Sequence, residues 1–435
     1  MKKRFLTIFL AIFITFGYCT GNVMAGQRAI ESKIQEEYYN MIESEELKQL
    51  ECLNEVLQDE NEFEEIDAAY KQLEIELPIG VEKEEELKTV SNNSRMLLFA
   101  SGVCVSGNKT LTYARYTMNI ARKTYYSIST SLKTSSYCFG QKLVETFDLP
   151  GMCRTNVNGN DCCDMTPQGI EYACGYIFIT AYCYLGDHES VVYVIDGSTK
   201  EYITTLVLDG KPHVGGIAYA NECLWICDGG NKNGKAIIHY YEIRQIINAI
   251  EYADRFDYVT SINLEGYEHG KVYLKDQSGC SFISAYQGAL YIGVYNEKEE
   301  GVLGAYYIEA SNGAEFSAFN TTKIPAKAQG IEFYNAYGYM YTIITTSSGV
   351  NNDSKVYVYR AKGTSSATAK AVYYKTISMP SNIEGPLIYN GRTYFVFESG
   401  SHFWGSVKSL AAGVGQAKSD HVGQVVGFAN TFIYK

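Results

Sequence analysis

The sequence predicts an all-β protein: a β-propeller of about five four-stranded blades, preceded by a small helical segment. Two observations predict it. From about residue 140 onward, short apolar runs with strand character recur, and a glycine opens a run at Gly169, Gly216, Gly330 and Gly385. The spacings are 47 residues, then 114 over two units, then 55, which is the size of a propeller blade. The 38 tyrosines and only 7 prolines agree, since tyrosine favours half-buried sheet surface.

The first 25 residues have the composition of a signal peptide. Lys2, Lys3 and Arg4 precede an apolar run at residues 5–18, and small residues precede Gly26. This order is typical of a cleaved export signal, and the apolar run is short for a membrane span. We therefore expect a secreted, extracellular protein with no integral membrane span after cleavage. A retained anchor or a lipoprotein is the alternative.

Residues 26–94 are predicted to form an acidic helical segment and a linker. Apolar residues recur at three- and four-residue steps over residues 28–77, and Pro78 and Gly80 end the pattern. Between residues 26 and 90 there are 20 acidic and 6 basic side chains, whereas the mature remainder is almost neutral. A near-neutral main domain lacks the basic footprint of nucleic-acid binding, so we expect no nucleic-acid partner.

Residues 141–435 are predicted to form the propeller. Residues 95–140 are expected to add strands or a side module, so a propeller of six blades is the alternative. A helix is expected at residues 244–252, inserted between the last two strands of the second unit. The outermost strands of the first three units are expected at residues 202–208, 258–264 and 315–324.

The ring is predicted to close by pairing strands from the two ends of the domain. The fifth unit ends at an apolar run, residues 431–434, and is one strand short of four. Residues 143–149 have the character of the outer strands of other units. Placing both in one blade leaves no open sheet edge.

One stretch resembles a known family of propellers. Residues 191–219 contain a strand ending in Asp196, an outer strand, then Pro212-His213 and a glycine that opens the next blade. This order resembles the YVTN-repeat and NHL-type propellers over about one and a half blades. The resemblance implies the propeller fold and no single function, because those proteins include binding platforms, lactonases and cofactor enzymes.

A second stretch, residues 384–397, resembles another family. Its Glu384-Gly385-Pro386 is similar to the segment that holds the general acid in five-bladed glycosidases of the arabinanase and xylosidase type. In that family an aspartate base lies in an Asp-Pro of the first blade, whereas this sequence contains no Asp-Pro and has its Glu-Gly-Pro in the last blade. The resemblance implies a glycan-acting hydrolase with Glu384 as general acid.

The candidate binding residues come from the repeat itself. Inner strands converge on the axis of a propeller, so polar residues at equivalent places on them converge at one mouth. The candidate ligand-binding residues are Gln168, Glu171, His213, Gln329, Glu332 and Glu384. Structural hydrogen bonds between neighbouring blades are the alternative role for such groups.

No motif for a metal or a cofactor is found, so neither is expected. The six histidines show no H-x-H or HExxH spacing, and no Cys-x-x-Cys pair recurs with zinc spacing. Twelve cysteines in an exported chain suggest disulfides, with eleven left after signal cleavage and no connectivity that spacing settles. We therefore expect a secreted binding module for an unknown small molecule, glycan or protein, with the hydrolase as the alternative.

Overall fold

The computed structural model describes the residues that form the propeller. The described residues are 70–71, 73–78, 143–152, 154–255, 261–349, 352–362, 368–401, 403–404 and 422–434. The predicted signal peptide, the predicted helical segment up to residue 69 and the predicted module at residues 95–140 lie outside them. Within the described stretches, no helix has the length and apolar character needed to cross a membrane.

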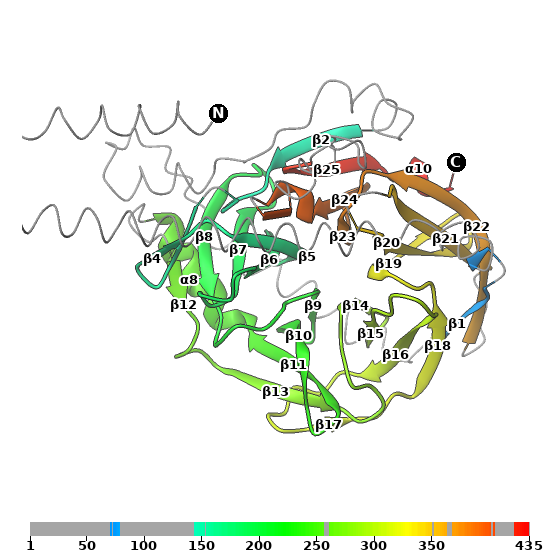
Figure 1. Ribbon diagram of the computed structural model, residues 1–435, viewed down its shortest axis with the longest axis horizontal. Helices are drawn as coiled ribbons and strands as arrows, with labels where there is room; N and C mark the ends of the chain where they lie inside the picture. The colour runs from blue at the N-terminus through cyan, green and yellow to red at the C-terminus, as the bar shows by residue number, and fades with distance from the viewer. Residues whose placement is uncertain are drawn as a thin grey trace, which may run out of the picture. The chain divides into compact units, whose positions relative to one another are not determined.

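The described strands form five mainly antiparallel sheets that stand in a ring, and each sheet is one blade (Figure 1). The inner strands of blades 1 to 5 are β5 (Met165–Ala173), β9 (Ile217–Ala220), β14 (Phe282–Tyr286), β19 (Ala328–Ala336) and β23 (Ile383–Tyr389). The second strands are β6 (Tyr176–Cys183), β10 (Cys223–Lys232), β15 (Ala289–Val294), β20 (Tyr339–Thr346) and β24 (Arg392–Phe397). The predicted fold class is confirmed.

The outer half of each blade completes the count of four strands. The third strands are β7 (Val191–Asp196), β11 (Lys235–Glu242), β16 (Gly301–Tyr307), β21 (Ser354–Lys362) and β25 (Gln424–Ala429). The fourth strands are β8 (Tyr202–Val207), β13 (His269–Leu274), β18 (Asn320–Ile324), β22 (Thr368–Met379) and β2 (Leu143–Asp148). A separate hairpin, β3 (Thr155–Val157) and β4 (Asn160–Cys162), lies between β2 and β5 in the chain.

Three further strands cover the outer edges of blades 1, 2 and 4. The strand β12 (Ser261–Asn263) pairs in parallel with β8, and β17 (Glu315–Phe316) pairs in parallel with β13. Residues 75–77 were expected to end the helical pattern, but they belong to the strand β1 (Ile75–Pro78), which pairs antiparallel with β22. The edge of a sheet carries unpaired N–H and C=O groups, and these additions satisfy some of them.

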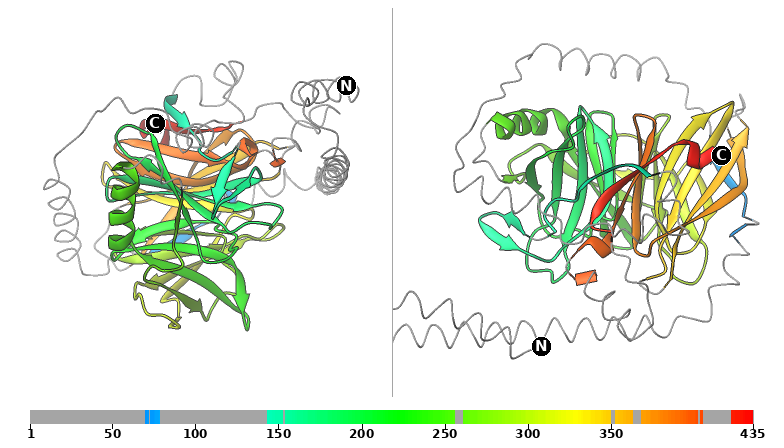
Figure 2. Two further views of the ribbon diagram at one scale, coloured as in Figure 1. Left: turned by 90° about the vertical axis from the view of Figure 1, so that its left-hand side faces the viewer. Right: turned by 90° about the horizontal axis from the view of Figure 1, so that it is seen from above.

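These pairings correct two of the expected outer strands. Residues 258–264 were expected to complete blade 2, but their strand β12 joins blade 1, and β13 completes blade 2 instead. Residues 315–324 were expected as one strand, but they divide into β17 on blade 2 and β18 on blade 3. The predicted helix is confirmed as α8 (Ile243–Arg255), which packs at the rim against β8 (Figure 2). This helix returns the chain to blade 1 before blade 2 is complete.

The ring closes through the two ends of the domain, as predicted, in blade 5. The strand β2 pairs antiparallel with β25, in a register that places Thr146 opposite Val426 (Figure 1). The expected strand at residues 431–434 is wrong, because these residues form the short helix α10 (Thr431–Tyr434). Its buried Phe432 and Ile433 pack against blades 4 and 5, so their apolar character reflects helix packing and not strand pairing.

The core consists of five apolar clusters, and each fills the space between two neighbouring blades. Tyrosine supplies much of it, which explains its abundance. Fully buried tyrosines are Tyr193, Tyr241, Tyr291, Tyr306, Tyr357, Tyr359 and Tyr394. A tyrosine buries a large apolar ring and still offers a hydroxyl to a partner, which suits sheets that face each other at close range.

Candidate functional site at the propeller axis

The repeated glycines mark where the inner strands touch. A Cβ atom on Gly169 would lie 2.8 Å from the backbone nitrogen of Ile217, and one on Gly216 would lie 2.6 Å from that of Ile283. A Cβ on Gly330 would meet the ring of Pro386 at 2.4 Å. The glycines therefore permit backbone-to-backbone contact between adjacent blades.

This contact makes the axis narrow. The cavity at its centre, lined by these glycines with Gln329 and Phe282, has a volume of about 10 Å³, which is about the space of one water molecule. The centre of the axis is therefore too narrow for a sugar or a peptide to enter. This narrow centre separates the predicted site residues into two groups. Gln168, Gln329 and Glu384 lie at one end, which we call the Glu384 end. Glu171 and Glu332 lie at the other, which we call the Glu171 end.

Three of the predicted residues lie in irregularities of the inner strands. The strand pairing shifts register between Pro167 and Ile170, between Ala328 and Gly330, and between Ile383 and Pro386. These shifts contain Gln168, Gln329 and Glu384. A bulge turns a side chain away from the regular alternation and is frequent beside functional sites.

At the Glu384 end, the structure brings Gln168 and Glu384 together with Glu398. The amide nitrogen Nε2 of Gln168 donates hydrogen bonds to the Glu398 carboxylate, at 2.7 Å, and to the carbonyl of Pro167, at 3.0 Å. The side chain of Glu384 is 1% exposed. Within the described part of the chain, its oxygen Oε1 has no hydrogen-bond partner.

Burial sets the protonation of both carboxyl groups. It raises the pKa of Glu384 well above the ordinary value, and the neighbouring Glu398 raises it further. Burial likewise raises the pKa of Glu398 to about 7, against hydrogen bonds from Gln168 and Asn382 that lower it. Neither carboxyl takes part in an ion pair formed between described residues. A cation bound beside Glu384 and Glu398 would therefore favour the loss of a proton from these carboxyls.

Aromatic rings lie beside these carboxyls. Burial raises the pKa of Tyr182 well above its ordinary value, and the charges of Glu398 and Glu384 add to this effect. The ring of Tyr182 stacks on His213, with 4.3 Å between ring centroids. His213 is exposed, and its backbone N–H donates to the carbonyl of Asp228 at 2.5 Å. Gln329 is half-buried and lines the small cavity.

Glu171 and Glu332 lie at the other end. Each is two residues past its glycine, and a strand advances about 3.3 Å per residue. Glu171 accepts hydrogen bonds from the backbone N–H groups of Tyr172, at 2.7 Å, and Tyr219, at 3.0 Å. Glu332 accepts one from Phe333 N–H at 3.1 Å and one from the Ser284 hydroxyl at 3.4 Å.

These hydrogen bonds favour the structural role for Glu171 and Glu332. Tyr219 belongs to blade 2 and Ser284 to blade 3, so each carboxyl fastens its blade to a neighbour. Burial raises the pKa of Glu171 to about 7. Burial, followed by the charge of Glu171, raises that of Glu332 well above its ordinary value.

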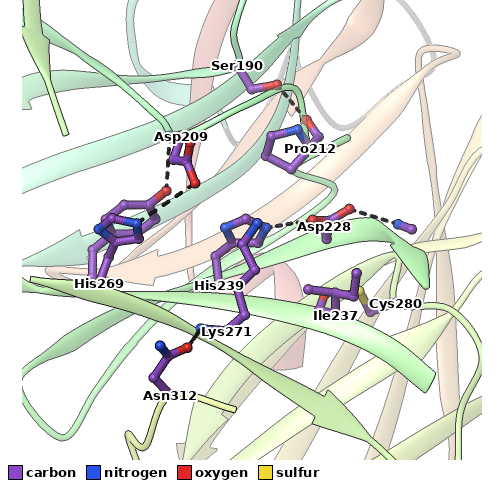
Figure 3. A network of polar contacts seen from close by, with 12 residues as sticks. Ser190, Asp209, Pro212, Asp228, Ile237, His239, His269, Lys271, Cys280 and Asn312 are labelled. Atoms are coloured by element: carbon purple, nitrogen blue, oxygen red, sulfur yellow. Dashed lines mark hydrogen bonds and ion pairs between the residues drawn. The ribbon is translucent and has the colours of Figure 1, made fainter. Parts of the chain in front are cut away.

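A second polar network lies in blade 2 (Figure 3). The ring nitrogen Nε2 of the buried His239 lies 2.5 Å from the Oδ2 atom of Asp228. Burial is the largest influence on the pKa of Asp228 and raises it, but the hydrogen bond and charge of His239, the Gly230 N–H and the charge of Lys271 together leave that pKa below its ordinary value. Tyr241 stacks between His239 and His269, with centroids 6.5 and 5.4 Å away. This network joins β10, β11 and β13, and we assign it a structural role.

Sequence reasoning missed Glu398, Asn382 and Tyr182. Glu398 opens the 3-10 turn η1 (Glu398–Gly400) directly after β24, and it lies outside the inner strands that the repeat identifies. Tyr182 lies on a second strand, β6. The sequence offered one indication of Glu398 and Tyr182, which is that each follows the apolar part of a second strand.

No family model matches the chain, and no curated protein does. Among solved structures, the hydrazine synthase of Kuenenia stuttgartiensis is similar over 60% of this chain and 74% of its own, with 9% sequence identity and a TM-score of 0.30. A likeness this low carries no argument about function.

Proposed function

We propose that the protein is a binding module whose ligand presents a positively charged group to the Glu384 end of the axis. One observation carries this proposal. Glu384 is 1% exposed and its oxygen Oε1 lacks a partner among the described residues. A buried, unsatisfied carboxyl oxygen costs free energy in the unliganded protein, and a ligand that supplies the missing donor recovers it.

The neighbours of Glu384 favour a cation as that donor. Glu398 adds a second carboxyl, and neither carboxyl forms an ion pair with a described residue, so a bound cation can neutralise the charge that appears when the pair loses a proton. Tyr182 and the exposed His213 present a stacked aromatic pair, and the faces of aromatic rings attract cations. An ammonium group is about as small as a water molecule and suits the narrow axis. The chemical class is thus an amine, either free or on the side chain of a protein partner.

Binding fits this geometry better than hydrolysis. A glycosidase must bring a sugar ring between its two carboxyls, whereas Glu384 and Glu398 are buried, at 1% and 9% exposure. The resemblance of residues 191–219 to YVTN and NHL-type propellers agrees with a binding role, because some of those propellers are binding platforms. We propose that the module acts outside the cell, as its N-terminal sequence indicates.

The test uses small cations as probes and a matched variant as control. Lysine and spermidine, with xylose and arabinose for comparison, are added while the melting temperature is measured, since a ligand that binds the folded state raises it. The amines should stabilise the wild type and Glu171→Gln, and they should not stabilise Glu384→Gln. Glu171→Gln makes the same change at the other end of the axis. Equal stabilisation of Glu384→Gln, or stabilisation by sugars alone, would contradict the proposal.

A further inference from the structure

Two cysteines and a histidine from separate parts of the chain meet beside blade 1. Cys162 ends β4, Cys183 ends β6, and His188 lies in the connection between β6 and β7. One ligand atom from each lies within 4.8 Å of the other two. Both cysteines are buried and are free thiols, and His188 is half-buried. Among the described residues, these three side chains form a group that is placed to bind one metal ion together.

The distances suit a tetrahedral zinc ion. The sulfur Sγ of Cys183 lies 3.7 Å from Nδ1 of His188. Zinc bonds sulfur at about 2.3 Å and imidazole nitrogen at about 2.0–2.1 Å, so a tetrahedral angle separates two such ligands by about 3.6 Å. The side chains therefore need little movement to bind the ion. Thiolates with an imidazole favour zinc over the hard cations magnesium and calcium.

We propose that Cys162, Cys183 and His188 bind a zinc ion through two sulfurs and Nδ1, with a fourth position open to water or another ligand. Sequence spacing could not show this site. Cys162 and Cys183 belong to no Cys-x-x-Cys pair, and the β3–β4 hairpin brings Cys162 to the end of β6. The adjacent pair Cys162-Cys163 is not the functional unit, because Cys163 is exposed and Cys162 faces blade 1.

The ion would fasten the hairpin to the ring. The strands β3 and β4 form a two-stranded sheet outside every blade, and a hairpin of this size is marginally stable alone. The hairpin follows the closing strand β2 and precedes the first inner strand β5. A zinc ion between Cys162 and Cys183 would thus cross-link the chain at the point where it passes from blade 5 to blade 1.

The protein offers a matched control for the test. Cys227 and Cys280 are also buried free thiols in mutual contact, and Cys280 donates to the carbonyl of Ile237 at 3.1 Å. Within the described residues they belong to no such ligand group. Full-length protein purified without chelator is analysed for metal by mass spectrometry. About one zinc per chain is expected in the wild type and in Cys227→Ser. Cys162→Ser, Cys183→Ser and His188→Gln should each retain less than a tenth of that amount.

Cobalt substitution checks the ligands independently of zinc content. Bound Co²⁺ should give a thiolate-to-metal charge-transfer band that Cys227→Ser keeps and Cys183→Ser weakens. Circular dichroism identifies any variant that has failed to fold. If a cysteine variant fails, the metal content of His188→Gln decides the question, because His188 is only half-buried. Wild-type protein without zinc, equal zinc in Cys183→Ser, or a Cys162–Cys183 disulfide in the protein as isolated would each overturn the proposal.

Discussion

Gln168 donates a hydrogen bond of 2.7 Å to Glu398, a residue 230 positions later in the chain. Gln168 lies on the inner strand of blade 1, and Glu398 follows the second strand of blade 5. These blades are neighbours only because the ring closes. The candidate site at the Glu384 end therefore exists only in the closed propeller, and any change that opens the ring should abolish binding together with stability.

The glycine contacts at the axis predict that two glycine-to-alanine substitutions will differ greatly in their effect on the free energy of unfolding. Gly216→Ala places a Cβ 2.6 Å from the Ile283 backbone nitrogen, and overpacking of this kind typically costs 1–3 kcal/mol or more. Gly266→Ala adds the same methyl group where nothing lies within 4 Å, so it should change stability by less than about 0.5 kcal/mol. Urea unfolding measures both. Equal stabilities would show that the inner strands move apart freely.

The pairing of β2 with β25 predicts two different outcomes for two C-terminal truncations. A chain that ends at Ala429 keeps β25 but loses the buried Phe432, so it should fold with a lower melting temperature, because burying a phenylalanine contributes about 3–5 kcal/mol. A chain that ends at Gly423 lacks β25, and we expect no cooperative melting. Circular dichroism on heating distinguishes them. Intact melting of the shorter chain would refute closure through β25.

The buried glutamates predict that stability falls as pH rises through the weakly acidic range. The folded-state pKa of Glu398 is about 7, whereas an unfolded glutamate has about 4.3. Between these values the folded protein holds a proton that the unfolded chain has released, so this group stabilises most below about pH 4.3 and its contribution is lost by about pH 7.

Glu398→Gln should make this slope shallower, by at most about 1.4 kcal/mol for each pH unit. The measurement is urea unfolding at pH 5 and pH 7.5, with the exposed Glu265→Gln as control. A slope that Glu398→Gln leaves unchanged would mean that this carboxyl is already ionised in the folded protein.

The strand β1 predicts that the N-terminal segment contributes to the propeller. Ile75 is buried opposite Ala371, and the Tyr359 hydroxyl donates to the Tyr70 carbonyl at 3.1 Å. A chain that begins at residue 91 should therefore melt below a chain that begins at Glu55, and it should associate more readily, because the edge of β22 is then uncovered. Glu74→Ala, at an exposed ion pair, serves as control. Identical melting would show that β1 adds nothing.

Much of the fold follows from the repeat alone, because four glycine-opened runs recur at blade spacing and the structure has an inner strand at each of them. The errors lie at the rim. There, β12 and β17 pair with a neighbouring blade, and strand character in a sequence does not specify the partner. Residues 431–434 show a related limit, since four apolar residues have no periodicity that separates a strand from one helical turn.

The candidate site was predictable in part for a similar reason. Gln168 and Glu384 occupy equivalent places and do converge, but Glu171 and Glu332 lie past the glycines, so the same repeat sends them to the other end. Glu398 and the trio of Cys162, Cys183 and His188 depend on contacts between segments that no local pattern links. Such contacts become visible only when the tertiary structure is known.

The closing sheet also determines when folding can finish. Asp148 pairs with Gln424, which is synthesised 276 residues later. Contacts between residues so distant in sequence form slowly, because the intervening loop must first be ordered. A nascent chain of this protein therefore cannot complete the sheet that contains β2 until Gln424 has been translated.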